Sequence, residues 1–132
     1  MSPPYNLSSA GKVIAFAADY SNMSIMYAGA SEMPWWGPYS QSGVFKTTDG
    51  GKVWYRVNRG LGNPSVGALW LNQSDPDIVL AATPAGIYRS ADAGTSWTRV
   101  YNVSGYAFSS SEDTVYAATG QGVPASTDSG IS

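Results

Sequence analysis

Two stretches of the sequence, TTDGGKVW at residues 47–54 and SADAGTSW at residues 90–97, carry a Ser or Thr, an Asp, a Gly and a Trp at the same spacing. A third stretch, STDSGIS at residues 126–132, carries the same Ser, Asp and Gly, and the sequence ends one position before the Trp is due. The motif has the form S/T-x-D-x-G-x-x-W, and its Asp recurs after 43 and then 36 residues. A recurrence of about 40 residues predicts an array of repeated supersecondary units.

The segments before each motif also align with one another. SIMYAGA (24–30) matches DIVLAAT (77–83) and DTVYAAT (113–119), and SGVFKT (42–47) matches AGIYRS (85–90) and QGVPAS (121–126). Short apolar runs separated by Asp, Asn and Gly turns predict four antiparallel strands in each unit. The units are expected at about residues 10–60, 61–103 and 104–132, and together they form a single domain over residues 1–132 whose last unit is incomplete.

The composition is typical of short strands joined by tight turns. The 132 residues include 15 Gly and 8 Pro, and only 12% are charged, which favours an all-β fold. The chain has neither Cys nor His. This excludes thiol and imidazole catalysis and most zinc sites, so no metal site and no cofactor are expected.

Charge and hydropathy also limit the partners. The net charge of −2 and the absence of a basic run argue against nucleic acid. No apolar stretch is long enough to insert into a membrane, and no signal peptide is recognisable. Four N-x-S/T sequons, at Asn6, Asn22, Asn72 and Asn102, favour an extracellular location, but a Ser-rich surface also explains them, so the compartment is left open.

Four-stranded meanders at this interval are typical of β-propeller blades, which bury their faces against neighbouring blades. The S/T-x-D-x-G-x-x-W motif resembles the Asp-box, or bacterial neuraminidase repeat (BNR), of propellers in sialidases, sortilin-like receptors, photosystem II assembly factors and xyloglucan-active endoglucanases. The resemblance covers nearly the whole chain. It implies a partial propeller of about two and a half four-stranded antiparallel blades with Asp-box hairpins, and it is more specific for fold than for activity.

The motif residues are expected to be structural. A short Asp side chain in a hairpin turn can accept hydrogen bonds from backbone N–H groups, Gly permits a left-handed backbone, and Trp covers the hairpin with apolar area. These residues are Thr47, Asp49, Gly51 and Trp54, then Ser90, Asp92, Gly94 and Trp97, and finally Ser126, Asp128 and Gly130. A catalytic or calcium-binding set of three Asp residues is disfavoured, because the resemblance places these turns at the propeller edge, away from the binding face.

The first unit departs from the repeat between its second and third strands. The second unit uses two residues there, whereas the first uses residues 31–42, an insertion of ten. Within it, Trp35, Trp36 and Tyr39 form an aromatic patch stiffened by Pro and Gly, which suits a sugar ring or a partner protein. The resemblance implies that this loop lies on the ligand-binding face. Alternatively, these aromatic residues pack over a neighbouring blade or fill the central channel.

The acids offer little for catalysis. Glycoside hydrolysis usually needs two carboxyl groups about 5 to 10 Å apart. Glu32 is the acid to which the repeat gives no structural role, and Asp19 aligns with Asn72 in a turn. These two are the candidate catalytic acids. Arg89 aligns with Lys46 and Arg99 with Arg56, so we interpret the basic residues as charge on blade surfaces rather than as the arginine triad of sialidases.

The leading interpretation is therefore a non-catalytic propeller segment that binds a carbohydrate or a protein. One alternative is a fragment of a glycoside hydrolase resembling the xyloglucan-active endoglucanases, and another is an assembly scaffold without a small ligand. Because fewer than about four blades cannot close a ring, partners are expected to be other copies of the chain or the remaining blades of a larger propeller. The missing third Trp favours a truncated remnant of such a propeller; alternatively, residues 1–7 add the fourth strand of the third unit, in the same chain or in a second copy.

Overall fold

The computed structural model describes residues 4–5, 12–31, 43–61, 65–111 and 114–126. In these ranges every regular element is a β-strand. The described residues contain no helix long and apolar enough to cross a membrane. The strands are β1 (Pro4–Tyr5), β2 (Lys12–Ala18), β3 (Met26–Ser31), β4 (Gly43–Thr47), β5 (Trp54–Arg56), β6 (Ala68–Leu71), β7 (Val79–Thr83), β8 (Gly86–Ser90), β9 (Thr98–Tyr101), β10 (Gly105–Ser111), β11 (Thr114–Thr119) and β12 (Ala125–Ser126).

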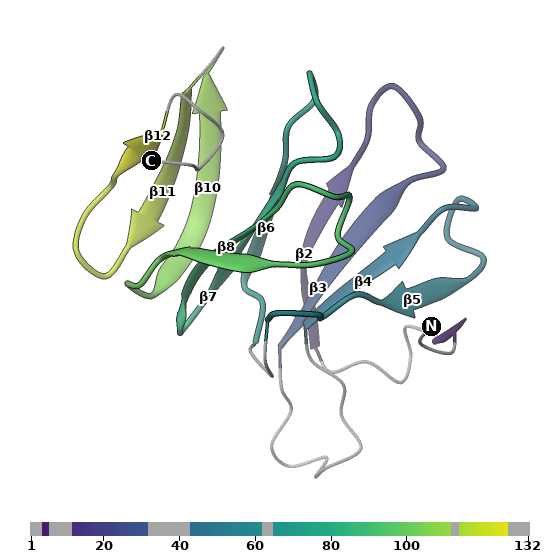
Figure 1. Ribbon diagram of the computed structural model, residues 1–132, viewed down its shortest axis with the longest axis horizontal. Helices are drawn as coiled ribbons and strands as arrows, with labels where there is room; N and C mark the ends of the chain where they lie inside the picture. The colour runs from purple at the N-terminus through teal and green to yellow at the C-terminus, as the bar shows by residue number, and fades with distance from the viewer. Residues whose placement is uncertain (1–3, 6–11, 32–42, 62–64, 112–113, 127–132) are drawn as a thin grey trace, which may run out of the picture.

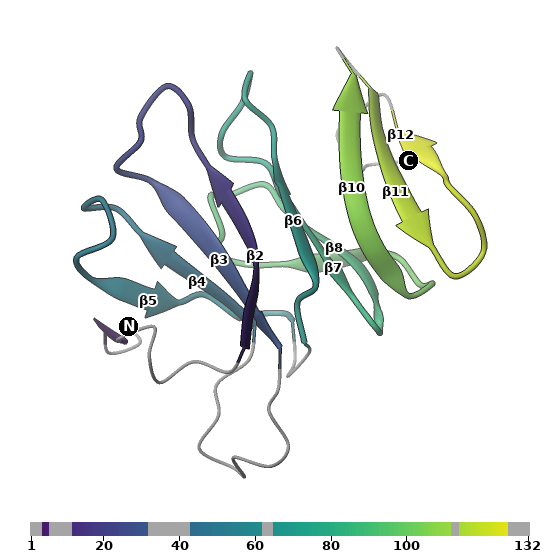
Figure 2. The ribbon, with the colours of Figure 1, turned by 180° about the vertical axis from the view of Figure 1, so that it is seen from behind.

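The strands form three antiparallel sheets that lie side by side (Figure 1 and, from behind, Figure 2). The first blade has the order β1-β5-β4-β3-β2, the second β6-β7-β8-β9 and the third β10-β11-β12. Strand β6, which opens the second blade, contacts β2 of the first blade and β10 of the third. This arrangement confirms the prediction of a partial β-propeller in which consecutive meanders pack face against face.

The same pairing register recurs in all three blades. In each blade, the Ser or Thr that opens the sequence motif pairs with the aligned residue near the start of the neighbouring strand. The pairs are Met26↔Thr47, Val79↔Ser90 and Val115↔Ser126. Because a shift of one residue would turn every side chain to the other face of the sheet, the matching registers give equivalent positions equivalent surroundings.

Strand β1 extends the first blade instead of completing the third. Tyr5 pairs with Trp54, so β1 lies on the outer edge of β5. The third blade lies at the far end of the molecule (Figure 1). The alternative in which the N-terminal segment adds a strand to the third blade of the same chain is therefore wrong, because that segment pairs with the nearer open edge.

The main core lies between the first and second blades. Tyr27 and Val44 of the first blade pack there against Val79, Ala81 and Trp97 of the second. Strand β7 is buried along its whole length, because neighbouring blades cover both of its faces. Its sequence, VLAAT, is accordingly an apolar run without polar alternation.

The third blade exposes apolar side chains on the face turned away from the second blade. Tyr116 and Val123 are 41% and 66% exposed, whereas their counterparts in the first blade, Tyr27 and Val44, are fully buried. At the other end of the array, Phe16 on β2 is 58% exposed. An apolar surface of this kind favours contact with other protein.

We expect Gly94→Ala to destabilise the fold by about 1 to 3 kcal/mol. Gly94 has φ +87°, and a Cβ there would lie 3.1 Å from Cε1 of Tyr27 in the core. Gly67→Ala is the matched control, because a Cβ at Gly67 meets nothing within 4 Å. In urea unfolding, the free energy of unfolding of Gly67→Ala should lie within about 1 kcal/mol of the wild-type value. An equal loss of this free energy in the two variants would contradict the packing described.

Candidate functional site

The first motif hairpin is held by the carboxylate of Asp49. Its Oδ1 accepts hydrogen bonds from Oγ1 of Thr47 at 2.8 Å and from the backbone N–H groups of Lys52 and Val53, both at 3.0 Å. The Thr47 hydroxyl in turn accepts the N–H of Gly51 at 3.0 Å. Two polar side chains thus satisfy the amides that this tight turn leaves unpaired.

The second hairpin repeats this arrangement, with a bond from a Ser hydroxyl in place of one of the two backbone N–H bonds. Oδ1 of Asp92 accepts from Oγ of Ser90 and from the N–H of Ser96, both at 2.8 Å, while Oδ2 accepts the Ser96 hydroxyl at 2.6 Å. The Ser90 hydroxyl accepts the N–H of Gly94 at 2.8 Å. The aligned Ser, Asp and Gly of the two motifs therefore occupy equivalent places in equivalent turns.

Each hairpin contains two consecutive left-handed residues. Gly50 and Gly51 have φ values of 77° and 100°, and Ala93 and Gly94 have 57° and 87°. The N–H of the first residue of each pair then reaches the preceding turn, from Gly50 to the carbonyl of Ser24 at 3.0 Å and from Ala93 to that of Asp77 at 2.9 Å. The strained conformation of Ala93 accompanies this bond between two turns of one blade.

Hydrogen bonding lowers the pKa of both motif carboxyls. For Asp49 the largest cause is the N–H of Val53, followed by the hydroxyl of Thr47. For Asp92 the largest cause is the hydroxyl of Ser96. A carboxyl whose charged form accepts several hydrogen bonds holds its proton less readily, so both groups are ionised at neutral pH within their own turns.

Asp19, one of the two candidate acids, forms the turn between β2 and β3. Its buried carboxylate accepts the N–H of Ser21 at 3.0 Å and the Ser21 hydroxyl at 2.7 Å. Asn72 forms the corresponding turn of the second blade and accepts the N–H of Ser74 at 2.9 Å. Since an amide takes the same place in the next blade, this turn has no need of a negative charge.

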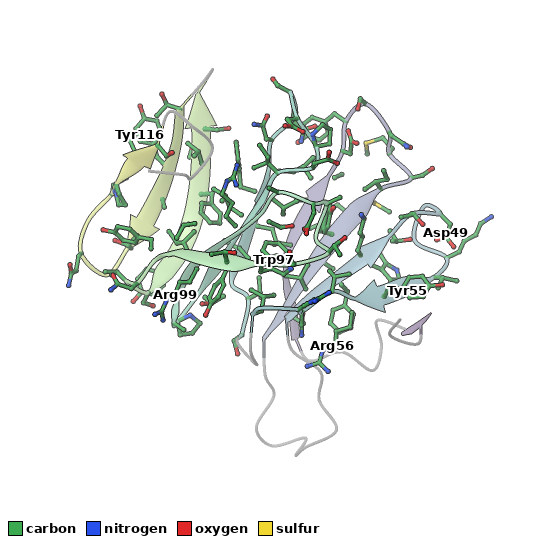
Figure 3. All side chains as sticks on the ribbon, viewed as in Figure 1. Asp49, Tyr55, Arg56, Trp97, Arg99 and Tyr116 are labelled. Carbon is green, nitrogen blue, oxygen red and sulfur yellow. The ribbon has the colours of Figure 1, made fainter. Side chains whose placement is uncertain are left out.

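Trp97 joins the first and second blades. Its indole N–H donates to the carbonyl of Val57 at 2.7 Å, and its backbone N–H donates to the carbonyl of Arg59 at 2.8 Å. Figure 3 shows Trp97 in the middle of the molecule and Asp49 on a hairpin at its edge. The indole of Trp54, by contrast, donates within its own hairpin, to Gly51 at 3.0 Å.

Lys46 lies between the blades, so our interpretation of it as surface charge is wrong. Its Nζ donates to the carbonyl of Ala93 at 2.8 Å and lies 5.4 Å from the centroid of the Tyr27 ring. Burial lowers the pKa of Lys46 and, most strongly of several causes, raises that of Tyr27. The buried Tyr27 hydroxyl has no hydrogen-bond partner among the described residues, so Tyr27 contributes to this contact through its ring.

Gln73 makes a second polar link between these blades that the sequence did not indicate. Its amide nitrogen donates to the carbonyl of Ala18 at 3.0 Å, and its amide oxygen accepts the N–H of Tyr20 at 2.9 Å. Both bonds connect residues more than fifty positions apart. Nothing in the local pattern around Gln73 distinguishes it from an ordinary polar turn residue.

The connections at the other end of the blades are short in the second and third units. Oγ1 of Thr83 donates to the carbonyl of Gly86 at 2.8 Å, and Oγ1 of Thr119 donates to that of Gly122 at the same distance. In the first blade, Ala30 pairs with Gly43 at the corresponding place. The inserted residues therefore leave and re-enter the sheet at the end opposite the motif hairpins.

Several candidate residues lie outside the described residues. These are Glu32, Trp35, Trp36 and Tyr39 of the inserted loop, and Asp128 and Gly130 of the third motif. Among the residues that are described, no group of three or more His, Cys, Asp or Glu side chains could hold a metal ion. The described site thus consists of two Asp hairpins, the turn of Asp19 and the joint around Trp97.

The structure is similar to solved structures of larger proteins. An ancestral GH74 enzyme matches with a TM-score of 0.72 and 19% identity over 98% of this chain and 19% of its own. YCF48 from Cyanidioschyzon merolae matches with a TM-score of 0.69 and 15% identity, over 98% of this chain and 38% of its own. The GH74 xyloglucanase from Xanthomonas campestris matches with a TM-score of 0.64 and 17% identity, over 91% of this chain and 22% of its own.

These neighbours are β-propellers, so the similarity shows the fold. The chain spans about a fifth to two fifths of the length of these proteins. Comparison of the sequence with family models and with curated proteins finds no match.

The lowered pKa values predict a loss of stability in acid. The stabilisation from each carboxylate is fully present above the pKa of an unfolded Asp, about 3.9, and is lost as the pH falls through the lower value of the folded state. We expect the Tm of the wild type to fall more between about pH 6 and pH 2.5 than that of the Asp49→Asn, Asp92→Asn double variant, whose amides do not titrate. Circular dichroism melts measure both falls; equal falls would contradict this role of the carboxylates.

The two tryptophans predict different costs for the same substitution. Trp97→Phe removes the donor to a part-buried carbonyl of another blade, and we expect a loss of about 2 to 3 kcal/mol in the free energy of unfolding. Trp54→Phe is the matched control, because its hydrogen bond lies within one hairpin, and it should cost about 1 to 2 kcal/mol. Denaturant unfolding measures both losses. A larger loss for Trp54→Phe than for Trp97→Phe would contradict the role of Trp97 in joining the two blades.

Proposed function

We propose that this chain is a non-catalytic Asp-box propeller segment that acts as a binding and assembly module for a carbohydrate or a protein. The observation that most supports a non-catalytic role is the use of its acids. Asp19, Asp49, Asp75 and Asp92 each accept a hydrogen bond from within four residues in their own turns. A carboxylate that accepts hydrogen bonds inside its own turn has a structural role there, whereas glycoside hydrolysis requires two carboxyl groups that act on the substrate.

The assignment to the Asp-box family rests on the two hairpins. Each places a Ser or Thr hydroxyl and an Asp carboxylate on the backbone amides of one turn. A Trp follows in the next strand or immediately before it, as the family pattern requires. The likeness in fold to propellers that include a GH74 xyloglucanase is consistent with this assignment.

The proposed ligand site is the aromatic patch of Trp35, Trp36 and Tyr39. In repeat proteins an insertion into one unit commonly carries the binding residues. The corresponding connection of the second blade is a two-residue turn closed by the Thr83 hydroxyl. We infer a polysaccharide ligand because aromatic faces with polar edges stack on sugar rings.

The second candidate is a fragment of a glycoside hydrolase with Glu32 as an acid. It is favoured by the likeness in fold to two GH74 proteins. In this case Glu32 would act together with a carboxylate from a part of the enzyme that this chain does not supply. In either case, the exposed Phe16, Tyr116 and Val123 suit partners that are copies of the chain or other blades.

Retention of the protein in an affinity gel containing xyloglucan tests the ligand. We expect a Trp35→Ala, Trp36→Ala double variant to lose most of the retention, at least about fivefold in the apparent dissociation constant, because stacking of this kind contributes on the order of 1 kcal/mol. Tyr20→Ala is the matched control, because Tyr20 is an aromatic residue 75% exposed in the turn between β2 and β3. Equal retention of all three proteins would remove the patch as the binding site.

Release of reducing sugar from xyloglucan distinguishes the enzyme. We expect none above background from the purified chain. Hydrolysis that disappears in Glu32→Gln would establish the second candidate and refute the non-catalytic role.

A further inference from the structure

We propose that the exposed ring of Tyr106, at the start of β10, is a stacking platform for one pyranose ring of a polysaccharide, and that the sugar ring lies in the open space at Gly67 of the neighbouring strand β6. The proposal deepens the carbohydrate-binding role proposed above and rests on it, because it assigns a second contact to the same ligand. The evidence comes from comparing the first strands of the three blades.

Tyr106 is the extra residue of a β-bulge. Gly105 pairs with Thr119 and Ala107 with Ala118, so one residue of β10 is inserted between two successive pairs. A bulge of this kind changes the direction in which a side chain points, and bulges are over-represented next to active sites. Tyr106 is 61% exposed. The bulge therefore presents a large aromatic side chain to solvent instead of burying it between two blades.

The other two blades have the same irregularity at the aligned place. Strand β2 has its register shift at Ile14. In the second blade, the N–H of Gly67 donates to the carbonyl of Ala82 at 2.9 Å, and Ala82 also pairs with Ala68. The fold thus provides one such position in every blade, and the sequence decides which side chain it carries.

The second blade has open space at this position. A Cβ at Gly67 would meet nothing within 4 Å, whereas a Cβ at Gly29 would lie 2.7 Å from Cγ1 of Val66 and one at Gly105 would lie 3.0 Å from Cγ1 of Ile87. Strands β6 and β10 contact each other and lie side by side in Figures 1 and 2. The space at Gly67 therefore adjoins the strand that carries Tyr106, so a flat ring can occupy it.

Tyr106 lies at the end of the blades from which the inserted loop leaves. Its neighbour Gly105 pairs with Thr119, which aligns with Ala30 of the first blade. Ala30 pairs with Gly43, where the chain re-enters the sheet after the insertion. A ligand held by residues of the loop therefore meets the same end of the molecule as Tyr106.

The turn beside the Tyr106 hydroxyl is polar and uncharged. A Cβ at Gly120 would lie 3.7 Å from the hydroxyl oxygen of Tyr106. The N–H of Gly120 donates to the carbonyl of Ser104 at 3.0 Å, which ties this turn to the chain just before Tyr106. The next residue of the turn, Gln121, is exposed. Its amide can donate to one sugar hydroxyl and accept from another, while the C–H groups of a sugar ring stack on the phenol.

The distribution of charge favours a neutral ligand at Tyr106 over a basic peptide. Within the described ranges, the carboxylates lie in turns at the opposite end of the blades, with the motif hairpins. A cationic partner would be attracted to that end. These acids are Asp19, Asp49, Asp75, Asp77 and Asp92.

Retention in an affinity gel containing xyloglucan tests the platform. We expect Tyr106→Ala to raise the apparent dissociation constant at least about threefold, because it removes the stacking face, whereas Tyr106→Phe keeps the ring and should stay within about twofold of wild type. Tyr20→Ala is the matched control, since Tyr20 is 75% exposed at the opposite end of the blades. Equal retention of Tyr106→Ala and wild type would overturn the proposal.

Fluorine NMR of the full chain with 3-fluorotyrosine locates the contact. The resonance of Tyr106 is the one absent from Tyr106→Phe, and that of Tyr20 is the one absent from Tyr20→Phe. Titration with a soluble xyloglucan heptasaccharide should shift the Tyr106 resonance saturably and leave that of Tyr20 in place. An unshifted Tyr106 resonance at saturation would show that the sugar binds elsewhere.

A variant that fills the space at Gly67 tests where the sugar ring lies. Gly67→Leu adds a branched side chain without a flat face, and we expect it to weaken binding of the heptasaccharide at least about threefold. Gly67→Ala adds one methyl group to a space that is open for 4 Å and should change the affinity less than twofold. Undiminished binding by folded Gly67→Leu would overturn the placement at Gly67.

Two outcomes separate this proposal from the ligand site proposed above. Retention that is lost in Tyr106→Ala but kept in the Trp35→Ala, Trp36→Ala double variant would contradict the loop patch and support the platform. Retention that is lost in the double variant but kept in Tyr106→Ala would contradict the platform alone.

Discussion

The hydrogen bond from the indole of Trp97 to the carbonyl of Val57 is the contact on which the stacked arrangement of the blades depends. A single four-stranded meander has an apolar side on both faces and cannot bury them alone. The bond fixes the depth at which the large ring enters the joint, and the ring then covers Tyr27, Val44 and Val79 in one cluster. Lys46 and Gln73 add hydrogen bonds across the same joint. Because hydrogen bonds are directional, they restrict the orientation of the two blades more than apolar packing alone does.

The fold was predictable because its local signals repeat. Asp49 and Asp92 sit in turns whose amides need an acceptor, and the Gly two positions later is needed for a positive φ. The upstream runs could be aligned on these anchors, and the register pairs Met26↔Thr47 and Val79↔Ser90 repeat that alignment. The turn signals act within about four residues, from Asp49 to Val53 and from Asp92 to Ser96, and short local patterns of this kind can be interpreted from a single sequence with simple rules.

The contacts between the blades could not be predicted, because they join residues that lie far apart in the sequence. Lys46 contacts Ala93 and Gln73 contacts Ala18, across separations that leave no trace in spacing or periodicity. Lys46 aligns with Arg89, which suggested repeated surface charge, yet the neighbouring blade covers its ammonium. The pairing of β1 with β5 depends on which open edge lies nearer, and that is a property of the assembled chain. The aromatic patch at Trp35 and Trp36 was found as a departure from the repeat, and its role stays a prediction.

The two sides of the first joint differ in the groups that they contribute. The later blade brings the indole N–H of Trp97 and the amide of Gln73 to the carbonyls of Val57 and Ala18, whereas the earlier blade brings the ammonium of Lys46 to the carbonyl of Ala93. Such a junction is heterologous: one surface never meets a copy of itself, and each added unit regenerates the surface that the next one requires. The number of units in a closed ring of such blades is consequently set by the wedge angle between successive sheets, and duplication or loss of a whole unit leaves the chemistry of every remaining junction unchanged.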